Sequence, residues 1–184
     1  MEEKRYIERK ISGYIKRAAG MYPVVTICGP RQSGKTTLAR HLFPDYGYVS
    51  MENPYERQAF EVDALGFLKA HPAPYIFDEV QNTPELLSYL QGIVDDVDEN
   101  GMYILTGSRQ MELQQTISQS LAGRSAMVDL LPLSLEELAE AEIPVSRDEA
   151  MFLGGLPRIH SRHQDPLLAY PDYVRTYIER DVRQ

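Results

Sequence analysis

Residues 29 to 36 form the feature of this sequence that most restricts its fold. They read Gly-Pro-Arg-Gln-Ser-Gly-Lys-Thr, a full match to the phosphate-binding pattern G-x-x-x-x-G-K-S/T. The apolar run from Val24 to Cys28 precedes the loop and predicts a buried parallel strand, and residues 36–42 continue as a helix. Because a strand, a glycine-containing loop and a helix are the context that this pattern requires, the chain is expected to bind a nucleoside triphosphate.

Each residue type in the loop has a physical task. Gly29 and Gly34 permit backbone angles that are closed to other residues, so successive N–H groups can turn inward around the β-phosphate. Lys35 brings a positive charge to the β- and γ-phosphates, and the Thr36 hydroxyl is placed to coordinate Mg²⁺. The predicted nucleotide-binding residues are Gly29, Pro30, Arg31, Gln32, Ser33, Gly34, Lys35, Thr36 and Thr37.

A second chemical signal is the apolar run from Tyr75 to Phe77, which ends in the adjacent acids Asp78 and Glu79. Acids at the carboxyl end of a parallel strand lie at the ligand crevice of an open α/β sheet. Asp78 is therefore predicted to hold Mg²⁺ through water, and Glu79 to deprotonate the water that attacks the γ-phosphate. The alternative is a pair of surface acids at a strand end, which the preceding phosphate-binding loop disfavours.

Two further positions complete the predicted catalytic set. The strand predicted at 102–105 ends in polar residues, of which Thr106 is favoured to bind the attacking water; Ser108 is equally well explained as a helix cap. Arg124 precedes the last predicted strand. It is either an arginine finger that acts on a γ-phosphate, often that of a neighbouring subunit, or a surface arginine near a helix C-terminus.

Short apolar runs alternate with helical patterns, which predicts an α/β fold with a parallel sheet. The runs lie at 24–28, 48–50, 75–77, 102–105 and 126–131. Three parts are expected: a basic N-terminal helix over 1–20, a P-loop nucleotide-binding core over 21–142, and a helical lid or linker over 143–184. The last part ends in helical phase without a terminating glycine or proline, so we expect it to be truncated.

Composition restricts the class of protein further. The 184 residues are 43% hydrophobic with a net charge of −8 and a single cysteine, Cys28, which is expected to be a buried core residue in a reducing compartment. No signal peptide or long apolar run is present, so a cytoplasmic protein without membrane contact is expected. Residues 1–20 carry six Lys/Arg against three Glu and are expected to form a solvated face, with nucleic-acid contact left open.

Together these elements resemble an AAA-type P-loop ATPase family of bacteria and archaea, over nearly the whole chain. The resemblance rests on the loop and on Ser50-Met51-Glu52-Asn53-Pro54, Phe77-Asp78-Glu79-Val80-Gln81, Leu105-Thr106-Gly107-Ser108, Leu121-Ala122-Gly123-Arg124, Gly154-Gly155-Leu156-Pro157 and Tyr177-Ile178-Glu179-Arg180-Asp181. It implies a three-layer P-loop NTPase sandwich whose five-stranded parallel sheet has the order 5-1-4-3-2.

The same resemblance implies ATP as the nucleotide, Glu79 as the base and Arg124 acting in trans within a homo-oligomer. Full members of the family are longer and carry a C-terminal domain similar to PD-(D/E)xK nucleases. The commonest AAA-type proteins have Asn at the tip of the fourth strand, whereas this chain has Thr106 and Ser108, which leaves the water-sensing assignment open.

The leading hypothesis is therefore Mg²⁺-dependent ATP hydrolysis that drives or times a conformational change in an attached domain or a protein partner. A nucleotide-dependent switch with little turnover, in a DNA-associated or defence assembly, is the second hypothesis. A small-molecule kinase is the third, and the sequence shows no arginine-rich lid or acceptor pocket for one.

Overall fold

The computed structural model describes residues 6–108, 115, 117 and 119–177. The chain divides into two compact units. The larger unit comprises residues 11–29 and 35–130, and the smaller one combines residues 1–10, 30–34 and 131–184. The smaller unit thus takes its segments from both ends of the chain and from the middle of the predicted phosphate loop. This division differs from the expected parts 1–20, 21–142 and 143–184, which remain a prediction.

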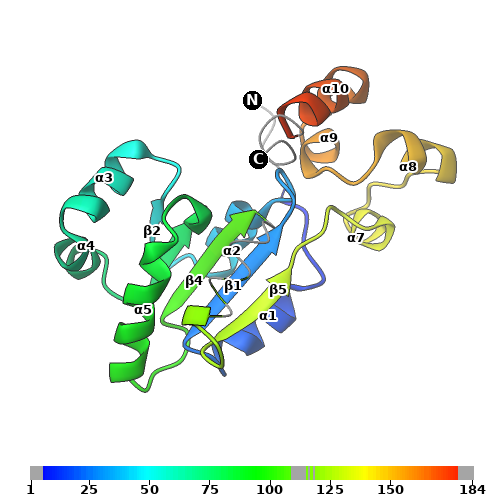
Figure 1. Cartoon of the computed structure of the whole chain (residues 1–184). Coiled ribbons are helices and arrows are strands. Elements are labelled where there is room, and N and C mark those ends of the chain that lie inside the picture. The colour runs from blue at the N-terminus through cyan, green and yellow to red at the C-terminus, as the bar shows by residue number, and fades with distance from the viewer. Residues whose placement is uncertain (1–5, 109–114, 116, 118, 178–184) are drawn as a thin grey trace. The chain divides into compact units, whose positions relative to one another are not determined.

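The described part of the larger unit contains one five-stranded parallel sheet (Figure 1). Each predicted apolar run overlaps one of its strands, which are β1 (Val24–Gly29), β2 (Gly47–Ser50), β3 (Tyr75–Asp78), β4 (Tyr103–Ser108) and β5 (Ser125–Asp129). The strand order is β2-β3-β4-β1-β5. This is the predicted order 5-1-4-3-2 counted from the other edge, so the predicted fold class is confirmed.

The register of β4 positions the functional residues. On one side β4 pairs with β1, with Ser108 opposite Gly29, and on the other it pairs with β3, with Leu105 opposite Phe77. The carboxyl ends of all three strands therefore meet at one edge of the sheet. In α/β sheets this edge is where ligands bind.

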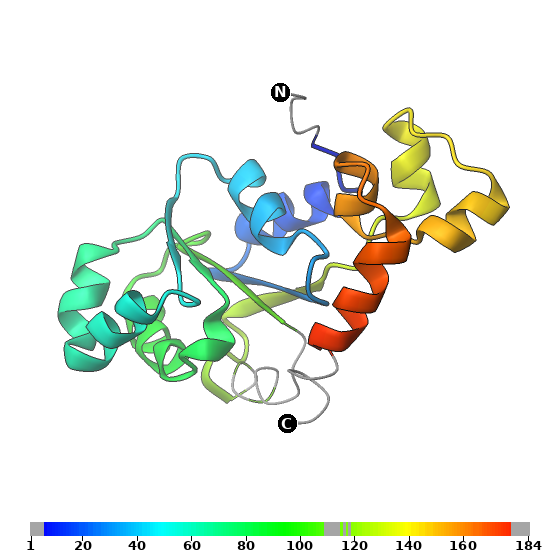
Figure 2. The same ribbon diagram turned by 90° about the horizontal axis from the view of Figure 1, so that it is seen from above.

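Helices cover both faces of this sheet (Figure 2). On one face lie α1 (Ser12–Ala19) and α2 (Lys35–Leu42), which contact β1. Toward the other face lie α3 (Pro54–Val62), α4 (Ala64–Ala70) and α5 (Glu85–Asp96). Alternate strand residues such as Cys28, Phe77 and Leu105 pack in one cluster with Leu87 and Leu90 of α5. Burial on both faces explains why the inner strands β1, β3 and β4 begin as continuous apolar runs, whereas β5 at the sheet edge alternates buried and exposed residues.

The N-terminal segment differs from the prediction. In the described residues the helix is only α1, and residues 6–9 lie outside any helix. The expected solvated basic face is also wrong for Arg9, whose side chain is buried in a polar network and only 7% of which is exposed. A buried guanidinium requires acceptors on several sides, and a regular amphipathic helix in water does not supply them.

The smaller unit contains four short helices in its described part: α7 (Leu135–Glu140), α8 (Arg147–Leu153), α9 (Pro157–Ser161) and α10 (Pro166–Tyr177). Helix α7 begins with a capping box, in which Ser134 and Glu137 each accept a hydrogen bond from the other's backbone N–H. Helix α10 lies within the segment 143–184 that was predicted to be helical. The last motif of the resemblance extends past Tyr177 and lies mostly outside the described residues.

The paired glycines at 154 and 155 have a structural role in this unit. Leu133 N donates to Gly155 O at 2.7 Å, and a Cβ on Gly155 would lie 2.5 Å from Leu133 O. Only glycine permits this approach between the two backbones. Among the described residues, no helix has the length and apolarity needed to cross a bilayer.

Candidate nucleotide-binding site

Residues 30–34 of the predicted phosphate loop belong to the smaller unit. Ser33 N donates to Pro30 O at 3.3 Å, which closes a turn. Gln32 has φ = 62° and Gly34 has φ = 95°, so both lie in the left-handed region that most residues avoid. Such turns direct successive backbone N–H groups toward one point, which is how a phosphate loop binds anions.

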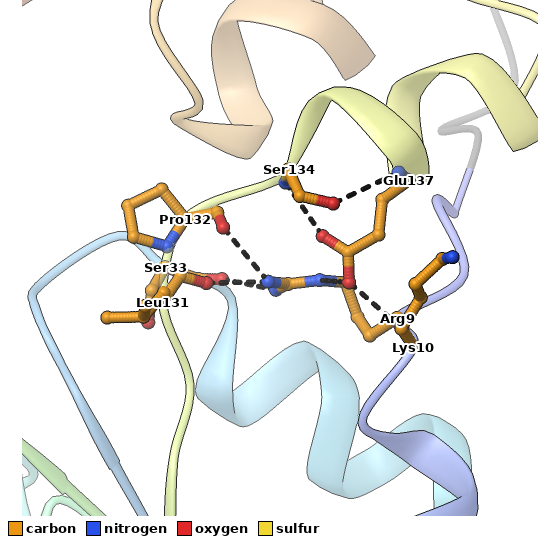
Figure 3. Close-up of polar contacts among 7 residues, drawn as sticks. All are labelled: Arg9, Lys10, Ser33, Leu131, Pro132, Ser134 and Glu137. Carbon is orange, nitrogen blue, oxygen red and sulfur yellow. Dashed lines mark hydrogen bonds and ion pairs between the residues drawn. The ribbon is translucent and has the colours of Figure 1, made fainter.

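Arg9 binds the main chain of this loop from within the same unit (Figure 3). Its Nη1 donates to Ser33 O at 3.0 Å, and its Nη2 donates to the carbonyls of Leu131 and Pro132. Its Nε donates to Glu137 Oε1 at 3.1 Å, in an ion pair whose side chains are 6% and 7% exposed. The Arg9 guanidinium thus links a loop carbonyl to residues that lie 122 to 128 positions after Arg9 in the sequence.

Glu137 is held in place by backbone donors as well. Ser134 N donates to Oε2 and Lys10 N donates to Oε1, each at 2.9 Å (Figure 3). Burial acts to raise the pKa of Glu137, but these two bonds and the Arg9 guanidinium outweigh it and hold the pKa below its ordinary value. Glu137 therefore remains charged opposite Arg9 over the neutral range of pH.

Helix α10 also contacts the loop main chain. Tyr173 Oη donates to Arg31 O at 3.4 Å. Within the smaller unit, the loop is therefore bonded both to the N-terminal segment through Arg9 and to the C-terminal helices through Tyr173. A change in the loop conformation would alter both contacts.

Lys35 and Thr36 begin α2 in the larger unit. The Lys35 ammonium is buried and donates to Gly29 O at 3.1 Å. Thr36 Oγ1 donates to Asp78 Oδ1 at 2.7 Å, which links the start of α2 to the end of β3. The structure thus brings together the predicted metal ligands Thr36 and Asp78.

Asp78 accepts hydrogen bonds from three hydroxyl groups. Besides Thr36, Thr106 on β4 donates to Oδ1 and Tyr48 on β2 donates to Oδ2 at 3.1 Å. Burial, followed by the charge of Asp78 and the bond to it, raises the pKa of Tyr48 to about 12. The phenol therefore stays protonated and keeps donating to the carboxylate.

Glu79 directly follows β3 in an unusual conformation. Its backbone is left-handed, with φ = 56° and ψ = 48°, and its N–H donates to Thr106 Oγ1 at 3.3 Å. Its Oε2 accepts from Gln81 Nε2, and Gln81 Oε1 accepts from Ser108 N at 3.3 Å. Thr106 donates to Asp78 and accepts from Glu79, and its predicted contact with the attacking water stays a prediction.

Arg124 lies away from these residues. Its backbone O accepts from Val24 N at 3.1 Å, at the amino end of β1, whereas the phosphate loop begins at the carboxyl end. Its guanidinium makes an ion pair with Asp95 on α5, which lowers the pKa of Asp95. Arg124 is therefore at the opposite edge of the sheet from Asp78 in its own chain.

The residues present fit a hard divalent cation such as Mg²⁺. Mg²⁺ prefers oxygen ligands and is commonly bound through one or two protein groups, waters and substrate phosphates. Thr36 Oγ1 and Asp78 Oδ1 are adjacent oxygen donors of this kind. No cluster of three or more His, Cys, Asp or Glu side chains able to hold a metal occurs among the described residues. A metal here would thus depend on the nucleotide for further ligands.

Sequence reasoning missed three residues of this arrangement: Arg9, Tyr48 and Gln81. Gln81 was already within the motif that carried the resemblance, so its position two residues after Glu79 was a usable signal. Tyr48 lies in a predicted strand, but its contact with Asp78 depends on β2 being the neighbour of β3. Arg9 carried no local signal, because its acceptors lie at Ser33 and beyond residue 130.

The fold and this arrangement define an AAA-type P-loop ATPase. A sequence model of the family described as "AAA domain" matches residues 21–139, and the chain belongs to this family. Membership supports ATP binding and hydrolysis as its general activity.

Two curated relatives are each 32% identical over 97% of this chain. They are the uncharacterized proteins Mb2031c of Mycobacterium bovis and Rv2008c of Mycobacterium tuberculosis. The chain spans 40% of the length of each.

Solved structures of other ATPases share the fold. The Walker-type ATPase PABY2304 of Pyrococcus abyssi superimposes with a TM-score of 0.62, at 16% identity over 96% of this chain and 74% of its own. AMPPCP-bound DnaA from Aquifex aeolicus superimposes with a TM-score of 0.51, at 16% identity over 94% of this chain and 63% of its own. At this identity the likeness concerns the fold alone.

Replacement of Arg9 by methionine is expected to destabilise the protein strongly. The variant leaves Glu137 without its counter-charge and three carbonyls without a donor, and breaking a buried ion pair costs about 3 to 5 kcal/mol. Urea denaturation followed by circular dichroism measures the loss. Lys10→Met is the matched control, since its ammonium pairs with Glu136 and Glu140 at the surface, and it should change stability little. Equal stability of the two variants would contradict the role of Arg9.

The Glu137 ion pair also predicts a pH dependence of stability. Because folding lowers the pKa of Glu137, its contribution is present above the ordinary value of about 4.3 and is lost as pH falls through the lower folded value. The difference in unfolding free energy between wild type and Glu137→Gln should therefore be constant near neutral pH and shrink below about pH 4. The exposed neighbour Glu136, replaced by glutamine, serves as control. A difference that grows on acidification would be inconsistent with this assignment.

Proposed function

We propose that this domain hydrolyses ATP with Mg²⁺ and couples hydrolysis to a conformational change in an attached domain or a partner protein. The observation that carries the proposal is the convergence of Thr36, Asp78 and Thr106 at the carboxyl edge of the sheet. The hydrogen bond from Thr36 to Asp78 brings the start of α2 next to the end of β3. Phosphoryl transfer requires metal-binding oxygens of this kind beside the phosphate loop.

Each residue has a distinct role in the proposed reaction. Backbone N–H groups of the loop and the Lys35 ammonium would bind the phosphates, and the ammonium would exchange Gly29 O for a phosphate oxygen. Thr36 and Asp78 would hold Mg²⁺, which when bound neutralises charge that develops on the β- and γ-phosphates.

Glu79 supplies the base in this proposal. Its carboxylate would accept a proton from water as the water oxygen forms a bond to the γ-phosphorus and the bond to the bridging oxygen breaks. ADP and inorganic phosphate are the products. Thr106 holds the backbone of Glu79 and the carboxylate of Asp78, so its proposed role is to position both acids.

Conformational coupling is supported by contacts within the smaller unit. The loop carbonyls of Arg31 and Ser33 are bonded to Tyr173 of α10 and to Arg9. A loop that closes on phosphate and opens after its release would shift these acceptors. The segments that Tyr173 and Arg9 belong to would then respond to the state of the nucleotide.

A nucleotide-dependent switch with little turnover is the second candidate. It is favoured by the position of Arg124, which is ion-paired with Asp95 at the opposite edge of the sheet. If Arg124 is required, its own chain does not place it at the phosphates, and turnover waits for a neighbour. Association with DNA, also part of this candidate, can be tested by titrating binding against salt, since phosphate contacts release counterions.

Substitution of the proposed base and of the loop lysine tests the primary function. Wild type should release phosphate from ATP in the presence of Mg²⁺ and stop when EDTA removes the metal. Glu79→Gln should lower kcat by about 100-fold while still binding ATP, because general-base contributions are of this size. Lys35→Ala should lose ATP binding. Exposed Glu99→Gln is the control, and equal rates for Glu79→Gln and wild type would rule out Glu79 as the base.

Mixing inactive variants tests whether Arg124 acts in trans. Arg124→Ala retains Glu79, and Glu79→Gln retains Arg124, so a mixture should regain activity that neither variant has alone. In wild type, the rate per molecule should rise with protein concentration. Exposed Arg147→Ala is the control for loss of a surface arginine. No recovery on mixing would contradict the role in trans, and negligible wild-type turnover at every concentration would favour the switch.

A further inference from the structure

The side chain of Gln81 connects Glu79 to the end of β4. Gln81 lies on the short 3-10 helix η1 (Val80–Asn82) that follows Glu79. Its Nε2 donates to Glu79 Oε2, and its Oε1 accepts from Ser108 N at 3.3 Å. A carboxylate can only accept and a backbone N–H can only donate, so this orientation of the amide alone satisfies both partners.

The backbone of Glu79 is fixed independently of this bond. Its left-handed conformation is uncommon for a residue with a side chain, and such conformations persist where surrounding contacts hold them. The contact here is the bond from Glu79 N to Thr106 Oγ1 at 3.3 Å. Thr106 therefore fixes the position of the Glu79 backbone, and Gln81 fixes the orientation of the Glu79 carboxylate.

A glutamate carboxylate without such a partner would be distributed over several rotamers. Ordering a long side chain costs conformational entropy that must otherwise be supplied when the reacting complex forms. The bond from Gln81 occupies Oε2. Among the residues that the structure describes it is the only hydrogen bond to this carboxylate, so Oε1 remains as the oxygen that can accept a proton from water.

We propose that Gln81 is the positioning residue of the base, holding the Glu79 carboxylate in the orientation needed for attack on the γ-phosphate. This inference rests on the proposed function, in which Glu79 is the base. Gln81 touches neither metal nor phosphate in the proposal and acts through Glu79. Its second bond, to Ser108, ties that orientation to the strand whose last residue pairs with Gly29 at the start of the phosphate loop.

Two substitutions separate the two ends of the amide. Gln81→Ala removes both bonds. Gln81→Glu has nearly the same shape and keeps an acceptor for Ser108 N, but it places a second carboxylate against Glu79. If Gln81 only joined β3 to β4, Gln81→Glu would behave as wild type. If it positions the base, both variants lose activity.

The experiment uses the full chain at about pH 8, where carboxylates are ordinarily ionised. Both variants should lower kcat about tenfold, with KM for ATP and affinity for a fluorescent ATP analogue unchanged. In the Glu79→Gln background neither substitution should lower kcat further, because the residue through which it acts is gone. Exposed Gln58→Ala on α3 is the matched control and should equal wild type.

Hydrogen exchange of the Ser108 amide, measured without nucleotide, gives a readout independent of activity. Exchange should speed up in Gln81→Ala and stay slow in Gln81→Glu, since only the former loses the acceptor. If the wild-type protein does not hydrolyse ATP, both the proposed function and this role of Gln81 are overturned. Hydrolysis that Glu79→Gln lowers, but that neither Gln81 variant changes, overturns the role of Gln81 alone.

Discussion

Parallel pairing of β4 with β1 on one side and with β3 on the other decides which side chains can meet in this protein. It places the strand that enters the phosphate loop and the strand that ends in Asp78 on either side of Thr106. Because successive residues in a strand face opposite sides, a shift of β4 by one residue would turn the Thr106 hydroxyl away from Asp78. The sheet is buried on both faces, so the same shift would disturb both halves of the core.

Two buried carboxylates, Glu137 and Asp78, differ in how their charge is stabilised. Glu137 is neutralised by Arg9, so its charge is used within the fold. Asp78 is stabilised by the hydroxyls of Thr36, Thr106 and Tyr48, which satisfy its oxygens without cancelling its charge. A buried carboxylate that is hydrogen-bonded but not paired retains its attraction for a cation. Of the two carboxylates, only Asp78 is suited to a metal.

The sequence predicted what depends on local patterns and missed what depends on tertiary contacts. All five strands were predicted because each is marked by a short apolar run in the sequence. The order of the strands came from the family resemblance. The roles of Tyr48 and Arg9 were not predicted because their partners lie 30 and 128 residues away in sequence, and no local pattern marks such contacts.

The two arginines singled out by sequence and structure differ in how firmly their partners hold them. Breaking the Arg9–Glu137 ion pair would leave an unpaired buried charge, which would destabilise the fold. Arg9 therefore has a structural role in holding the loop. Arg124 pairs with Asp95 while 34% of its side chain is exposed, and pairs in contact with water contribute little to stability. The six residues of β1 separate it from its own phosphate loop by roughly 16 to 20 Å. Arg124 can therefore exchange Asp95 for another anion, and in the proposed action in trans that anion is a γ-phosphate bound by a neighbouring chain.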